Sequence, residues 1–229
     1  MPPVAFTARI TEFDGTRRTA ALSAAEADAV IDSALLFDEA AVTAGGERHG
    51  TLTITHSISH PPSACGTLPA SRRWTAVLEA AHPVRPTLRQ YEDLALLAAW
   101  EEEHPEGAML TPAGAAATRF EHVPPASARH LLAAGWLTPD GGGAHGHVTV
   151  SYAGRIAMTL YQHRLRTGVV GAEAWASGAI SGGWVACPPL YVEGCTCGWR
   201  GPAPSGDAAI VRGHGRDHRQ GELQRLFVV

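Results

Sequence analysis

The sequence contains no lysine, so all 18 of its basic residues are arginine. Together with the many alanines, glycines and prolines, this bias is typical of GC-rich coding genomes such as those of actinobacteria. The sequence also lacks a long apolar run, because the longest, Leu94–Trp100, is far shorter than the ~20 residues of a membrane-spanning helix. The segment Met1–Phe6 has no charged stretch followed by an apolar one, so we expect no secretory signal peptide and a cytoplasmic location.

Cysteine is also scarce, with four residues in 229. Four cysteines in a chain of this size do not indicate a disulfide framework, and three of them lie between residues 187 and 197. In a reducing compartment such a cluster indicates metal binding. Charged residues make up only 17% of the chain and apolar residues 45%, which indicates a globular rather than a disordered protein.

The net charge of −4 hides an asymmetry along the chain. Residues 1–109 hold 8 arginines against 15 carboxylates, whereas residues 110–229 hold 10 arginines against 7 carboxylates. Any polyanion would therefore meet the second half of the chain. The sequence pI near 6.3 lies far below the value above 9 that is typical of strongly basic nucleic-acid-binding domains. The charge permits DNA binding without requiring it.

The first sixty residues predict a small α+β unit. Apolar residues partly alternate over 4–13, which indicates a strand, and Ser23 with Glu26 forms a capping box at the start of a helix. Segments 40–43 and 51–55 flank a Gly-Gly turn and predict a hairpin. The predicted order is βαββ.

Linkers divide the rest of the chain. Segment 61–69 predicts a linker, 72–81 a short helix, and 88–103 a longer amphipathic helix. The Gly- and Ala-rich segment 167–183 predicts a second linker. The fold class that we expect is α+β, with five segments: an α+β unit over 1–60, a linker and short helix over 61–87, a winged helix over 88–166, a linker over 167–186 and a zinc finger over 187–229.

The middle of the chain has the element order of a winged helix. A helix over 113–120 is followed by a second helix over 126–134, which Gly135 terminates. A hairpin with a glycine-rich tip around 139–147 comes next, and another helix begins at Ser151. This order predicts a helix-turn-helix followed by a wing.

Two stretches of this region, LLAAGWL at 131–137 and VTVSYAGR at 148–155, resemble the recognition-helix end and the wing exit of MarR-type regulators. The resemblance covers about residues 88–165 and implies that 126–134 enters the major groove while the hairpin lies over the adjacent backbone or minor groove. Winged helices also serve as protein-binding modules, so that use stays open. The candidate DNA contacts of the chain are Ser127, Arg129, His130, His145, His147, Arg155, Arg164, Arg166, Arg200, Arg212 and Arg216.

A metal-binding pattern lies near the carboxyl end. Cys195 and Cys197 are separated by one residue, and two histidines, His214 and His218, follow at i and i+4 spacing. A structural zinc ion takes four such ligands in a tetrahedron. Two cysteines can bind it from a tight turn, and two histidines at this spacing share one face of a helix, predicted here over 207–218. The sequence therefore predicts a structural Zn²⁺ held by these four residues.

Cys187 is an alternative ligand for this ion, and Trp199, Ile210 and Val211 are candidates for a small core around it. The segment, about 193–218, resembles the short Cys-x-Cys-Gly-Trp zinc fingers of actinobacterial proteins. The competing interpretation is a pair of reduced thiols beside a histidine-bearing helix.

Other motifs are weak. His56, His60 and Cys65 would make a second metal site or, more simply, a loop with exposed histidines. No catalytic motif is present, so we do not expect an enzyme. We expect a double-stranded DNA-binding protein, a transcriptional regulator or an accessory factor, in which the winged helix and the zinc finger contact one duplex. The alternative is a protein-interaction adaptor whose acidic N-terminal unit binds a partner, and the third is an enzyme whose site leaves no motif.

Overall fold

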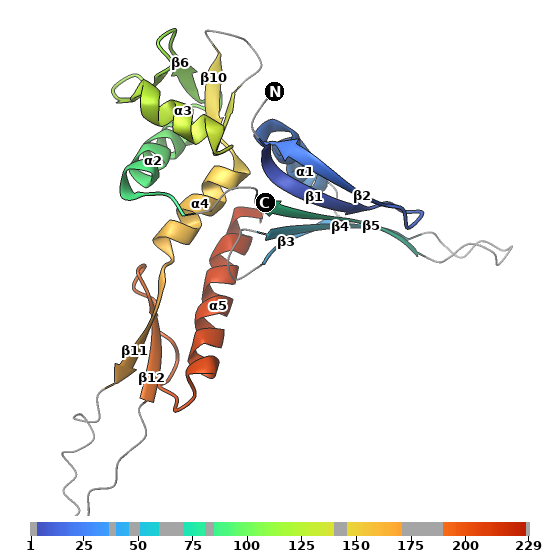
Figure 1. Ribbon diagram of the computed structural model, residues 1–229, viewed down its shortest axis with the longest axis vertical. Coiled ribbons are helices and arrows are strands. Elements are labelled where there is room, and N and C mark those ends of the chain that lie inside the picture. The colour runs from blue at the N-terminus through green and yellow to red at the C-terminus, as the bar shows by residue number, and fades with distance from the viewer. Residues whose placement is uncertain are drawn as a thin grey trace, which may run out of the picture. The chain divides into compact units, whose positions relative to one another are not determined.

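The computed structural model describes residues 4–36, 40–45, 51–59, 71–80, 85–139, 146–170 and 190–227 (Figure 1). These residues form five α-helices and three antiparallel sheets, which confirms the α+β class. The chain divides into two compact units: Met1–Tyr161 with Leu223–Val229 form unit 1, and Gln162–Glu222 form unit 2. In the described part, no helix is both long and apolar enough to cross a membrane.

Unit 1 begins with five strands and one helix: β1 (Val4–Thr11), β2 (Arg17–Ser23), α1 (Ala24–Leu35), β3 (Ala40–Gly45), β4 (Thr51–Ser59) and β5 (Ser71–Ala80). The strands form one sheet in the order β2-β1-β5-β4-β3. Ser23 and Glu26 form the predicted capping box of α1. Ile31 of α1 and Phe6 of β1 are fully buried in the core that the helix and the sheet share.

Strand β5 contradicts the short helix predicted over 72–81. It pairs with β1 on one side and β4 on the other, in the middle of the sheet. Ala76 and Leu78 are buried, whereas Val77 and Glu79 are not, and this period of two is that of a strand. The first sheet therefore includes a segment that lies beyond the predicted linker.

The rest of unit 1 contains α2 (Leu88–Glu103), β6 (Ala108–Leu110), β7 (Ala116–Ala117), β8 (His122–Val123), α3 (Pro125–Ala133), β9 (Leu137–Pro139), β10 (His147–Val150) and α4 (Tyr152–Gln162). Its sheet has the order β8-β7-β6-β10-β9. Helix α3 ends where predicted, because Gly135 has φ +69° and the amide of Trp136 donates to the carbonyl of Leu131 at 2.9 Å.

The helix predicted over 113–120 is wrong. A turn closes there instead, in which the amide of Ala115 donates to the hydroxyl of Thr111 at 3.1 Å and Gly114 has φ +81°. Strands β7 and β8 follow, so a short hairpin stands where the first helix of a helix-turn-helix was expected. Of the expected winged helix, α3, the β9–β10 hairpin and α4 are present, while the hairpin tip, residues 140–145, lies outside the described residues.

A partly buried polar network connects α1 with β9 and with the start of α4. Asp28 accepts hydrogen bonds from the hydroxyl of Thr138 at 2.7 Å and the amide of Tyr152 at 3.1 Å. Burial raises the pKa of Asp28, and these two hydrogen bonds oppose the rise. The hydroxyl of Tyr152 donates to Asp32 at 2.9 Å, and burial together with this bond raises the pKa of Tyr152 to about 12.

Unit 2 contains β11 (Leu165–Val170), β12 (Leu190–Cys195) and most of α5 (Ala208–Gln224), which the 3-10 turn Arg225–Phe227 follows. β11 occupies the start of the predicted linker 167–183, whose remainder lies outside the described residues. Asp207 accepts a hydrogen bond from the amide of Ala209 at 2.7 Å and so caps α5. Val211 is buried as predicted, but Ile210 is 53% exposed and does not join the core.

Candidate metal centre

His163 is placed beside the two cysteines by the register between β11 and β12. The antiparallel ladder ends at Cys195, but the pairing continues for one more residue. The amide of Thr196 donates to the carbonyl of Arg164 at 3.0 Å, and the amide of Arg164 donates to the hydroxyl of Thr196 at 3.0 Å. One residue further along, His163 therefore lies opposite Cys197.

The two cysteines lie at the end of β12 and in the tight turn that follows it, because Cys195 is the last residue of the strand. The amide of Gly198 donates to the carbonyl of Cys195 at 3.0 Å, and the amide of Cys195 donates to the carbonyl of Trp199 at 2.9 Å. Gly198 has φ +95°, a left-handed conformation that glycine adopts without strain. The turn therefore brings the thiols of Cys195 and Cys197 toward a common point, as the Cys-x-Cys-Gly pattern predicted.

Helix α5 supplies His218, and a glycine permits its close approach. A Cβ atom on Gly215 would lie 2.6 Å from Cγ of Glu193 on β12. Glu193 is buried, and its carboxylate accepts a hydrogen bond from the hydroxyl of Thr167 at 2.6 Å. Glycine costs about 1 kcal/mol relative to alanine inside a helix. At this position it allows α5 to lie directly against β12, which places His218 beside the cysteine turn.

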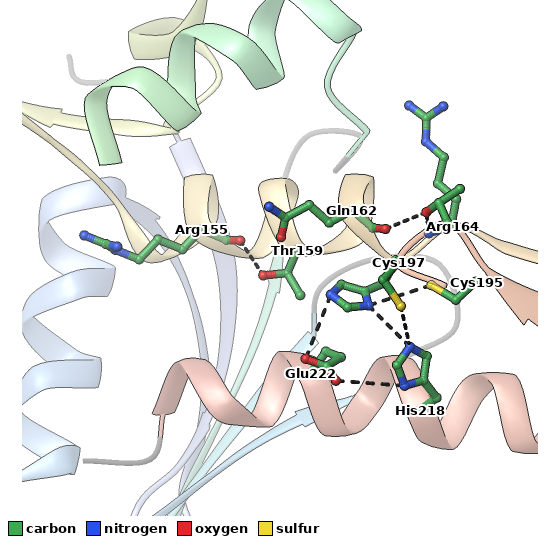
Figure 2. A network of polar contacts seen from close by, with 10 residues as sticks. Arg155, Thr159, Gln162, Arg164, Cys195, Cys197, His218 and Glu222 are labelled. Atoms are coloured by element: carbon green, nitrogen blue, oxygen red, sulfur yellow. Dashed lines mark hydrogen bonds and ion pairs between the residues drawn. The ribbon is translucent and has the colours of Figure 1, made fainter. Parts of the chain in front are cut away.

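The donor atoms of His163, Cys195, Cys197 and His218 all lie within 4.8 Å of one another (Figure 2). Nδ1 of His163 is 3.3 Å from Nε2 of His218, Sγ of Cys195 is 3.7 Å from the same Nδ1, and Sγ of Cys197 is 3.4 Å from the same Nε2. A zinc tetrahedron with Zn–N near 2.05 Å and Zn–S near 2.3 Å has edges of about 3.3 Å between nitrogens and about 3.6 Å between nitrogen and sulfur. The three separations fit these edges, so the group can hold one metal ion.

Glu222 lies one turn after His218 on α5 and faces both imidazoles (Figure 2). Its two carboxylate oxygens lie 3.9 Å from Nε2 of His163 and 3.9 Å from Nδ1 of His218, the nitrogens that are not in the donor group. A carboxylate at this place favours the tautomers whose lone pairs would face a bound metal ion. Trp199 also stacks on His218, with ring centroids 4.5 Å apart and an interplanar angle of 2°. Both contacts orient the imidazoles.

The two thiols differ in their surroundings. Cys195 is partly buried, whereas Cys197 is exposed. Burial raises the pKa of Cys195, a hydrogen bond from the amide of Cys197 opposes the rise, and the neighbouring thiol adds to it. A metal ion binds the thiolate form, so metal binding at this pair releases protons.

The predicted ligand set differs from this group in one residue. Cys195, Cys197 and His218 come together, but the fourth member is His163 and not His214. His214 lies one turn before His218, about 6 Å along the helix axis, and its buried Nδ1 has no hydrogen-bond partner. Three predicted metal ligands, Cys187 of this site and His60 and Cys65 of the second candidate site, lie outside the described residues.

Two of the predicted DNA contacts already have partners within unit 1. The hydroxyl of Ser127 donates to the carboxylate of Asp93. The guanidinium of Arg155 pairs with Glu101 at 2.6 Å, and the same glutamate accepts a hydrogen bond from the amide of Val150. Ser127 and Arg155 therefore hold helices of unit 1 in place.

The other predicted DNA contacts are divided between the units. Arg129 and His130 are exposed on α3, His147 is partly exposed on β10, and His145 lies outside the described residues. The five candidates of unit 2 are all exposed: Arg164, Arg166, Arg200, Arg212 and Arg216. Comparisons of the chain with protein-family models, curated proteins and solved structures give no match. The function of the chain is therefore inferred from the residues of the site.

Proposed function

We propose that unit 2 binds one structural zinc ion through His163, Cys195, Cys197 and His218. Two sulfurs and two imidazole nitrogens are a donor set that zinc prefers, and the spacing of the donor atoms supports a tetrahedral site. Four protein ligands leave no coordination position for a substrate, so the ion stabilises the fold. Among the described residues of unit 2, Val211 is the only buried apolar side chain, and so small a core needs such support.

Elemental analysis of the purified chain tests this proposal. We expect about one zinc per chain, and we expect Cys197→Ser to lose it, since a ligand is removed without a large change in volume. Thr196→Ser is the matched control, because it changes the neighbouring residue and keeps the hydroxyl that accepts from the amide of Arg164. A Cys197→Ser protein that retains its full zinc content would refute the ligand set.

We propose, secondly, that the protein binds double-stranded DNA and that unit 2 supplies most of the contact. In its described residues, the exposed charged side chains are five arginines against two carboxylates, Asp207 and Asp217. The other two carboxylates are less accessible, because Glu193 is buried and Glu222 lies against the histidines. A zinc ion with two thiolates and two neutral imidazoles adds no net charge. The described surface of unit 2 is therefore positive, and arginine holds phosphate oxygens in pairs.

Helix α3 supports this proposal less than the sequence suggested. Its exposed donors are Arg129 and His130, since Ser127 is bonded to Asp93. Base readout in the major groove needs several donors aimed at base edges. We therefore assign α3 a supporting role and expect little sequence preference.

Fluorescence anisotropy with a random 20-base-pair duplex tests DNA binding. We expect binding at low salt, with log K falling linearly with log salt by about 0.9 for each phosphate contact. A zinc-loaded protein that does not bind the duplex at 20 mM salt would end the proposal.

A protein-interaction adaptor is the alternative to a DNA-binding protein, and an exposed aromatic residue favours it. Phe120, at the turn between β7 and β8, is 81% exposed, and the guanidinium of Arg119 lies 5.4 Å from its ring centroid. A partner protein bound through the acidic unit 1 would lose affinity on Phe120→Ser, whereas DNA binding would not change.

A further inference from the structure

Three arginines of unit 2 share one face of its small sheet. Arg166 on β11 pairs with Gly194 on β12, and Gly194 forms a bridge on its other side with Arg200. Directly paired residues of antiparallel strands project to the same face. Arg164 is two residues before Arg166 and projects to that face as well. Arg164, Arg166 and Arg200 therefore define what we call the arginine face.

The opposite face of the sheet carries the metal centre and α5. Glu193 and Thr167 form a directly bonded pair on that side, and α5 lies against them at Gly215. Trp199 stacks on His218 there, so its neighbour Arg200 projects the other way. In Figure 2 the side chain of Arg164 points away from α5. All three arginines are exposed.

We propose that the arginine face is the phosphate-binding surface of the protein and that its ligand is the backbone of a DNA duplex. The inference rests on the proposed DNA binding and names the residues that carry it. Guanidinium groups hold two phosphate oxygens at once. Cα atoms two residues apart on a strand, as in Arg164 and Arg166, lie about 6.7 Å apart, so the two side chains can contact separate phosphates.

The composition of the face favours a duplex over a single strand. Single-stranded nucleic acids bind to platforms on which bases stack on aromatic rings. The other positions of the face whose side chains are described are Gly168, Leu190, Val192, Gly194 and Thr196, and none is aromatic. Trp199, the nearest aromatic residue in the chain, is stacked on His218 on the opposite side. The face therefore offers charge and hydrogen-bond donors without a stacking surface.

The metal centre positions this face. Arg164 follows the ligand His163 directly, and its amide and carbonyl are bonded to Thr196 between the two cysteines. Arg200 follows the cysteine turn and is held at Gly194 by the bridge. Loss of the ion frees His163 and the cysteine turn, the two segments that hold Arg164 and Arg200 in place. The three guanidinium groups then no longer lie on one face of the sheet. Duplex binding by the face is accordingly zinc-dependent.

The test compares two triple variants of the full zinc-loaded chain, each with the same change in charge. Arg164→Gln/Arg166→Gln/Arg200→Gln removes the face, and the control Arg129→Gln/Arg212→Gln/Arg216→Gln removes exposed arginines of α3 and α5. Zinc content and circular dichroism establish that each variant is folded. Anisotropy is measured with a random 20-base-pair duplex and a single strand of equal length, over a series of salt concentrations.

We expect the first variant to lower the salt slope by about 2.7, which is three contacts at about 0.9 each, and the control to lower it by less than 1. We also expect removal of zinc from the wild type to lower the slope by a similar amount, and single strands to bind more weakly than the duplex. A wild type that binds the duplex while the first variant keeps its slope would refute the arginine face and leave DNA binding standing. Tighter binding of the single strand would refute the choice of ligand. If the wild type binds neither probe, the proposed function itself fails.

Discussion

Replacing His163 and His214 one at a time separates the donor group seen in the structure from the ligand set that the sequence predicted. His163 contributes Nδ1 to the donor group, whereas His214 lies outside it. Structural zinc sites of four ligands stabilise small folds by about 10–16 kcal/mol, so one ligand accounts for about 2.5–4 kcal/mol if the four contribute equally. We therefore expect His163→Ala to weaken zinc binding by about two to three orders of magnitude.

His214→Ala is the control and should change zinc affinity by less than about threefold. Its imidazole leaves no bonded partner behind, because Nδ1 of His214 has no hydrogen-bond partner in the structure. The assay is competition with a chromophoric chelator at fixed pH, followed by circular dichroism of the metal-free forms. If His214→Ala lost the ion and His163→Ala kept it, the ligand set and the strand register behind it would both be wrong.

Three further changes test the surroundings of the centre and the core of unit 1. Glu222→Gln should weaken zinc binding about 10–100-fold without abolishing it, because the carboxylate orients His163 and His218; an unchanged affinity in the chelator assay would show that it does not act on them. Gly215→Ala should destabilise unit 2 despite the better helix propensity of alanine, since its Cβ would meet Glu193 at 2.6 Å. Gly221→Ala, which has open space around it, should instead stabilise the protein by about 1 kcal/mol in thermal unfolding. Equal effects of the two substitutions would contradict the packing of α5 against β12. Asp28→Asn should become more stable relative to the wild type as pH rises from about 4 toward 7. The reason is that a carboxyl whose pKa is raised in the folded state stabilises the wild type at low pH, and this stabilisation is lost when the carboxyl ionises. A difference in urea-unfolding free energy between the two proteins that does not change with pH would refute this.

Local signals in the sequence predicted most of the helices. The capping box of Ser23 and Glu26 begins α1, and Gly135 terminates α3 where its left-handed conformation is needed. Asp207 marks the start of α5. These features depend on residues a few positions apart, which a sequence displays directly.

Features that depend on distant pairing were missed. β5 alternates in the manner of a strand, but its alternation was interpreted as part of a short helix. The turn around Gly114 stands in place of the helix predicted over 113–120, because the hydroxyl of Thr111 accepts a hydrogen bond from the amide of Ala115 and closes a turn. In both cases the tertiary partner strands decide between structures of similar local propensity.

The proposed metal ligand His163 is the clearest case. Nothing near it in sequence marks a ligand. The signal that could have found it is the register of β11 with β12, which pairs Leu165 with Cys195 and, extended by two residues, places His163 opposite Cys197. The i, i+4 pair of His214 and His218 was the more conspicuous local pattern. On α5, however, the second partner of His218 at this spacing is Glu222, which faces the same imidazoles from outside the donor group. Helical periodicity thus identified the face of α5 that carries His218 and points toward the cysteines.

Zinc K-edge X-ray absorption of the protein purified with its metal is the most direct test of the proposed zinc centre. A centre of His163, Cys195, Cys197 and His218 predicts a four-coordinate ion with two sulfurs at about 2.3 Å and two nitrogens at about 2.0–2.1 Å. A third sulfur in the shell would bring in another cysteine and displace one histidine. A shell of oxygen and nitrogen alone, or a protein without zinc, would contradict the site on which both proposals for unit 2 depend.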